Sequence, residues 1–125
     1  MQIVSEYGTM LARNTKNING IPRSKKGGKG VYILFDGSMP VYVGKGNIKA
    51  RVSQARRSKR RKERWDRFSW YALKDPDNTM HDIEVLVLRM LPRCLRALTK
   101  NDGKFLKAKR HTEKDTTADY ITRKP

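Results

Sequence analysis

The stretch GVYILFDGSMPVYVGKGNIKAR, residues 30–51, decides the fold that we expect. Two runs rich in β-branched and aromatic residues, VYILF and VYV, are separated by DGSMP, whose residues favour a turn. This pattern is typical of a β-hairpin over residues 31–44, with its turn at Asp36-Gly37. The hairpin places Tyr32 and Tyr42 at matching positions in two neighbouring strands.

A helix is expected directly after the hairpin. The residues GKGN can end the second strand, and Asn47 is a suitable helix N-cap. Ile48, Val52 and Ala55 then follow at i, i+4 and i+7, so they share one face of a helix. Farther along the pattern becomes almost wholly basic, with eleven Lys and Arg side chains over residues 45–67.

The following segments complete an α/β pattern. FSWYAL, residues 68–73, predicts a third strand, and DPDN supplies turn residues after it. The segment TMHDIEVLVLRML, residues 79–91, has strand-like propensity in IEVLVL, but its length and its Thr79/Asp82 start favour a buried helix. We therefore predict an α/β fold with a small central antiparallel sheet of about three strands, flanked by helices.

The domain organisation follows from length and local composition. A chain of 125 residues with 37% hydrophobic residues is most simply one domain with a small core. Residues 1–29, with a short element around Tyr7 to Ala12, are expected to be an N-terminal extension and basic linker. Residues 30–107 form the predicted domain, and residues 108–125 a polar C-terminal tail.

The charge predicts a polyanionic partner. The chain has 29 Lys and Arg against 12 Asp and Glu, a formal charge of +17 and a pI near 10.4, so nucleic acid is the first candidate. No signal peptide, lipidation motif or membrane-spanning apolar run is evident, so we expect no membrane partner. The single cysteine, Cys94, excludes an internal disulfide and a zinc cluster of several thiolates, and it fits a reducing, cytoplasmic location.

Glu84 has the least favourable surroundings in the chain, because its neighbours along either a helix or a strand are apolar. Burying an unpaired carboxylate costs several kcal/mol, so the group must reach solvent, a cation or a metal ion. A salt bridge to one of the many arginines is the simpler interpretation by composition. A site for Mg²⁺, which is often held by one or two carboxylates and substrate phosphates, is the sharper one.

The tyrosines and Arg51 also allow two interpretations. Tyr32 and Tyr42 have the spacing of half-buried strand residues, and Arg51 is one of many basic residues. However, a guanidinium at the start of a helix packed on the hairpin can hold a phosphate at two oxygens. Two hydroxyls, a guanidinium and a carboxylate able to bind a metal form a workable set for phosphodiester hydrolysis.

At these residues the sequence resembles the GIY-YIG nuclease domain family, named for two tripeptides on adjacent strands. They read GVY, ending at Tyr32, and YVG, beginning at Tyr42. Arg51, the aromatic strand WDRFSWYAL, the Glu84 segment IEVLVLRMLP and Asn101 in NDGKF follow in the family's order. Valine replaces isoleucine in both tripeptides, which exchanges one β-branched residue for another. The resemblance covers roughly residues 30–105, within a 30–107 nuclease domain.

The resemblance implies a hydrolase, a metal-dependent endonuclease that acts on DNA with Mg²⁺ or Mn²⁺ and needs no small-molecule cofactor. Glu84 would bind the metal ion. Tyr32 would be the general base or orient the water molecule, and Tyr42 would bind the phosphate or assist it.

The resemblance also implies roles for three further residues. Arg51 would stabilise the transition-state charge, with Arg56 as its substitute if the register differs, and Asn101 would order the site through hydrogen bonds. Lys45 could contact phosphate, or favour the phenolate form of a tyrosine as a nearby cation does. His81 is a candidate auxiliary proton carrier, although a surface histidine near a helix start is the simpler description.

The basic segment is expected to bind DNA backbone without reading sequence, so affinity should fall steeply with salt. Trp65 and Trp70 could stack on unpaired bases, but core positions suit them better. The expected nucleic-acid-binding residues are Arg56, Arg57, Lys59, Arg60, Arg61, Lys62 and Arg64.

A rival interpretation is a non-catalytic basic nucleic-acid-binding protein, either a degenerate member of the same fold or of ribosomal type. It explains the charge equally well, but it leaves unexplained why a carboxylate on an apolar face follows the two tyrosines and Arg51 in family order. The sequence leaves open the substrate structure, DNA against RNA, one cut strand against two, and the oligomeric state.

Overall fold

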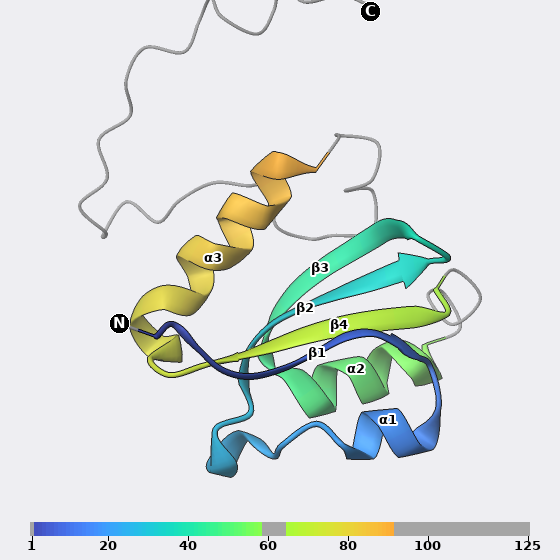
Figure 1. Ribbon diagram of the computed structural model, residues 1–125, viewed down its shortest axis with the longest axis horizontal. Helices are drawn as coiled ribbons and strands as arrows, with labels where there is room; N and C mark the ends of the chain where they lie inside the picture. Colours follow the sequence, from blue (N-terminus) through green and yellow to red (C-terminus); the bar gives the residue numbers. More distant parts are fainter. Residues whose placement is uncertain (1, 59–64, 92–125) are drawn as a thin grey trace, which may run out of the picture.

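The computed structural model describes residues 2–58 and 65–91, which form a four-stranded antiparallel sheet with helices on both faces (Figure 1). The strand order is β1-β4-β2-β3. Helix α3 covers one face of the sheet, while α1 and α2 lie on the other (Figure 1). The expected α/β class is confirmed at this level. The elements are β1 (Val4–Ala12), α1 (Thr15–Asn19), the 3-10 helix η1 (Ser24–Lys26), β2 (Lys29–Asp36), β3 (Met39–Asn47), α2 (Ile48–Arg57), β4 (Arg67–Leu73) and α3 (Pro76–Met90).

The hairpin of β2 and β3 forms as expected, with a turn one residue later than predicted. Asp36 lies opposite Met39, so the loop consists of Gly37 and Ser38. Gly37 has φ +62, at the first of the two loop positions, where glycine is preferred in a type II′ turn. The other strand predicted from the aromatic pattern, β4, pairs with β2 on the side opposite to β3.

The first strand is the main departure from the expected architecture, which had about three strands. Val4–Ala12 adds a fourth strand beside β4, where only a short element around Tyr7 to Ala12 within an N-terminal extension was expected. The pairing shifts register between Val4 and Glu6 and again between Gly8 and Leu11. At the second shift Met10 has φ +51, and its backbone N–H donates to Ser69 Oγ. Such bulges break the alternation by which a strand is recognised in a sequence.

Both predicted helices are present. In α2 the residues Ile48, Val52 and Ala55 are buried together, and Asn47 is the N-cap residue, although its side chain makes no capping hydrogen bond. The segment expected to be a helix rather than a strand is α3. It begins at Pro76, before the predicted start, because proline is well suited to the first turn of a helix, where its missing N–H has no partner to lose.

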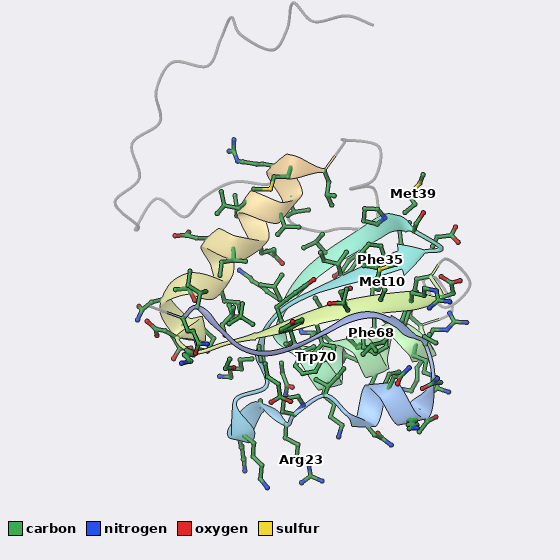
Figure 2. All side chains as sticks on the ribbon, in the orientation of Figure 1. Met10, Arg23, Phe35, Met39, Phe68 and Trp70 are labelled. Carbon is green, nitrogen blue, oxygen red and sulfur yellow. The ribbon has the colours of Figure 1, made fainter. Side chains whose placement is uncertain are left out.

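Each face of the sheet has its own apolar cluster. On the α2 side, Tyr32 and Tyr42 pack with α2 and β4 residues, and Figure 2 shows Phe68 and Trp70 on this side. On the α3 side, Val31 and Val43 pack with Leu88. Trp65 and Trp70 are both buried, as the core interpretation expected. Among the described helices, none is long and apolar enough to cross a membrane.

Candidate active site

The Tyr32 ring crosses from β2 over the edge strand β3. Tyr32 pairs with Gly44, and a Cβ atom on Gly44 would lie 2.4 Å from both Cζ and the hydroxyl oxygen of Tyr32. Glycine at position 44 is therefore required by the close approach of this ring. Tyr42 lies on the same face of β3, and the two ring centroids are 6.0 Å apart. The hydroxyl of Tyr32 is thus held over the edge strand.

Both tyrosine rings belong to the apolar cluster on the α2 side. Tyr32 is 2% exposed and Tyr42 is 9% exposed. Their neighbours in this cluster include Ile48 and Val52, from the helix that directly follows β3. Packing therefore accounts for the position of both rings, and a chemical role concerns only their hydroxyl groups.

Arg51 reaches the same stretch of β3 from α2. A Cβ atom on Gly46 would lie 3.7 Å from Arg51 Nε, and Gly46 has φ +116, a conformation that favours glycine. Gly46 is two residues from Gly44, so strand alternation places both on the tyrosine face. The alternative arginine, Arg56, instead donates to Thr15 Oγ1 at 2.8 Å. Of the two arginines, Arg51 is the one whose side chain lies beside the hairpin.

A polar cluster occupies the opposite face of β3. Lys45 follows Gly44 directly, and its Nζ lies 3.9 Å from Glu84 Oε1 and 2.5 Å from His81 Nδ1 of α3. Glu84 is 4% exposed and is the one buried carboxylate among residues 2–58 and 65–91. Its carboxylate is directed at the hairpin. The salt bridge expected for Glu84 is present, but its partner is this lysine rather than an arginine.

The position of this cluster follows from the local structure of α3. His81 and Glu84 are three residues apart, so they lie next to each other on the helix surface. The neighbouring side chains Val85 and Leu88 are buried, and they fix α3 against the sheet with Glu84 facing inward. From the sequence, His81 is expected to have only a minor role, as an auxiliary proton carrier or a surface histidine. Its i, i+3 spacing from Glu84 was the available signal, but the contact with Lys45 joins residues 36 positions apart.

The two groups of side chains flank the same short segment of β3, residues 44–46. Tyr32 and Arg51 lie along one face of this segment, and Lys45 leads to Glu84 on the other. Because β3 is the last strand in the sheet order, no strand among the described residues covers its outer edge. A substrate at this edge could contact groups from both faces.

The α3 side of this segment offers one buried carboxylate, Glu84, that could hold a divalent metal ion. Within the described residues there is no group of three or more His, Cys, Asp or Glu side chains that could hold a metal ion. Mg²⁺, however, is commonly bound through one or two carboxylates, with water and substrate phosphates as its other ligands. A single buried carboxylate at the edge of the sheet suits that kind of site.

The expected nucleic-acid-binding residues are described only in part. Arg56 and Arg57 line an open groove of about 550 Å³ between α1 and α2, together with Thr15, Ser53 and Asn19. Asn101 and five of the expected basic residues lie outside the described residues; the five are Lys59, Arg60, Arg61, Lys62 and Arg64.

No family model, no curated protein and no solved structure matches this chain. The resemblance to the GIY-YIG family is therefore an interpretation of the motif residues and their order in the sequence.

Proposed function

We propose that the chain is an endonuclease of the GIY-YIG type that hydrolyses phosphodiester bonds in DNA with one divalent ion, Mg²⁺ or Mn²⁺. The observation that carries the proposal is the Glu84 carboxylate, 4% exposed and directed at the tyrosine hairpin. The fold does not need a buried acid there, since a buried ion pair can often be replaced by apolar residues without loss of stability. A catalytic role explains why the chain keeps it.

The tyrosine face supplies the groups that handle the attacking water. As a phenolate, Tyr32 over Gly44 would take a proton from a water molecule and become the neutral phenol; as a neutral hydroxyl, it would orient that molecule through a hydrogen bond. The neighbouring Tyr42 hydroxyl binds a phosphate oxygen. Both rings are held by the core, so the hydroxyls need little reorganisation during the reaction.

The positive charges beside β3 neutralise the transition state. Arg51 has a planar fork that can contact two phosphate oxygens at once, and its side chain is exposed beside Gly46. Lys45 is a single mobile charge that can reach the same phosphate from the other face. Asn101 is proposed to order the site, as in the family pattern. A divalent ion bound by Glu84 would act as a Lewis acid at the leaving oxygen.

The basic surface supplies affinity rather than chemistry. The formal charge of +17 favours a polyanion, and the groove lined by Arg56 and Arg57 places two guanidinium groups at the C-terminal end of α2. Arg51 lies on the same helix, five and six residues before these two arginines. We place this activity in the cytoplasm, in keeping with the single cysteine.

The test is the nicking of supercoiled plasmid by the full chain with Mg²⁺ or Mn²⁺, with and without a chelator. We expect metal-dependent nicking that Glu84→Gln abolishes while a gel shift with the same DNA is retained. Glu6→Gln is the matched control, because Glu6 is an exposed carboxylate of β1 and should leave nicking unchanged. Cleavage by Glu84→Gln at the wild-type rate would overturn the metal role of Glu84.

The second candidate function is a non-catalytic nucleic-acid-binding protein. The burial of both tyrosine rings and the Lys45–Glu84 pair favour it, because a degenerate member of the fold would keep both for packing. A gel shift without nicking, under every metal condition, would support this function over hydrolysis.

A further inference from the structure

The ammonium group of Lys45 already marks the position of a cation between two side chains of α3. A lysine has donors and no acceptor, so His81 Nδ1 must be the acceptor in its contact with Lys45 Nζ. On the other side, Glu84 Oε1 lies 3.9 Å from the same nitrogen atom. An imidazole lone pair and a carboxylate oxygen are therefore directed at one positive charge.

We propose that His81 is a second protein ligand of the divalent ion, beside Glu84, and that it makes the site prefer first-row transition ions over Mg²⁺. This inference concerns the metal site of the proposed nuclease and so rests on that function. Metal binding can nevertheless be measured without DNA.

The chemistry of the two donors supports this preference. Mg²⁺ takes oxygen ligands and keeps much of its water, so an imidazole nitrogen adds little to its affinity. Imidazole suits nickel and zinc, and affinities of nitrogen and oxygen sites rise from Mn²⁺ through Co²⁺ to Ni²⁺. His81 and Glu84 supply two ligands from adjacent positions of one helix, and water and phosphate can supply the others.

Lys45 must leave this position when a divalent ion binds, because two cations cannot share it. Its side chain is 32% exposed, and its ammonium group is carried on a flexible stem, so this group can turn toward solvent or toward a phosphate at the edge of β3. In the free protein Lys45 therefore competes with the metal ion. Replacing Lys45 with methionine should raise the affinity for both Mg²⁺ and Ni²⁺.

Isothermal titration of the untagged full chain with NiCl₂ and with MgCl₂, in the absence of DNA, tests the proposal. We expect the wild type to bind Ni²⁺ more tightly than Mg²⁺. His81→Ala should weaken Ni²⁺ binding by at least about 10–100-fold, the loss seen when even a residue that only supports a ligand is removed, and leave Mg²⁺ binding within about twofold. Glu84→Gln should lose both ions.

The second of the two histidines, His111, provides the matched control: His111→Ala should leave both affinities unchanged. His81→Asn serves as a second variant, and circular dichroism checks that each variant is folded.

Unchanged Ni²⁺ binding in folded His81→Ala, or no preference for Ni²⁺ in the wild type, would overturn the proposal. Loss of Ni²⁺ binding in His81→Ala with no plasmid nicking by the wild type would leave the metal site standing and remove the nuclease function. Nicking by the wild type, together with unchanged Ni²⁺ binding in His81→Ala, would leave the nuclease function standing and remove His81 as a metal ligand.

Discussion

The two faces of strand β3 hold their functional candidates in different ways. On the α2 face, Tyr32 and Tyr42 are large rings within an apolar cluster. On the α3 face, Lys45, His81 and Glu84 form a polar cluster beside apolar residues such as Val43 and Leu88. The first group stabilises the fold whether or not it reacts, whereas a buried acid is costly unless it has a partner.

This difference shows where a functional explanation is needed. Burial in the apolar cluster is enough to explain the position of the two tyrosine rings. It gives little reason for their hydroxyl groups, since phenylalanine would pack in the same way. Burial does not account for Glu84, since an apolar residue would pack there at no electrostatic cost. The two faces should therefore respond differently to substitution: the α3 face in activity, and the α2 face in both activity and stability.

The largest expected effect separates function from stability at Glu84. The double variant Glu84→Leu, Lys45→Met should abolish cleavage, while the free energy of unfolding stays unchanged or rises by about 1–4 kcal/mol, as when a buried ion pair gives way to apolar residues and no unpaired charge remains. Urea unfolding and a plasmid assay measure the two quantities. A large loss of stability in the double variant would show that the ion pair is structural.

The next effect concerns the Tyr32 hydroxyl on the α2 face. Tyr32→Phe removes one oxygen and keeps the ring, so the cleavage rate should fall by about 10²–10⁴-fold, the usual contribution of a general acid or base. Because the ring remains, the free energy of unfolding should fall by no more than about 1–3 kcal/mol, the cost of losing a buried hydroxyl from its partner. Tyr7→Phe is the control, because Tyr7 is 65% exposed on β1 and lies outside the site. A cleavage rate for Tyr32→Phe equal to that of Tyr7→Phe would leave Tyr32 a packing residue.

A third substitution changes the position of the tyrosine without removing it. In Gly44→Ala the added methyl group would meet Tyr32 at 2.4 Å, so the ring must move. We expect a loss of stability of about 1–3 kcal/mol, typical of overpacking, together with reduced cleavage. Gly20→Ala, directly after α1, is the matched control, since the added Cβ atom would lie 3.3 Å from the backbone oxygen of Asn17. Wild-type stability in Gly44→Ala would contradict the ring position described above.

The smallest effect lies away from both faces, in the groove between α1 and α2. The double variant Arg56→Gln, Arg57→Gln should weaken DNA binding and reduce the slope of log affinity against log salt by about one to two. Cleavage at saturating DNA should be unchanged. Arg23→Gln, an exposed arginine beside η1 (Figure 2), tests whether only total charge matters. If Arg23→Gln weakens DNA binding as much, per charge removed, as the double variant does, the groove has no specific role in binding.

The regular parts of the fold were predictable from the sequence. The hairpin, α2, β4 and the helical state of α3 follow from local patterns of apolar residues that the structure keeps. Strand β1 was expected only as a short element around Tyr7 to Ala12, because its two register shifts and the left-handed conformation of Met10 hide the alternation. It pairs with a strand more than fifty positions away, so local propensity could not reveal it.

The candidate site was predictable as a list of residues but not as an arrangement. The motif order pointed to Tyr32, Arg51 and Glu84, and the structure brings all three toward residues 44–46 of β3. The division between two faces of the strand was not foreseen. Neither was the contact between Lys45 and His81, because it depends on how α3 lies across the sheet.

The most direct test of the central claim, that both faces of β3 act on one phosphate, is a crystal structure of Tyr32→Phe with uncleaved duplex DNA and Mn²⁺. We expect one phosphate at the edge of residues 44–46, contacted by Arg51 from one face and by a Mn²⁺ ion on Glu84 from the other. DNA bound along the Arg56 groove, with Glu84 still paired to Lys45 and no phosphate at this edge, would contradict the claim.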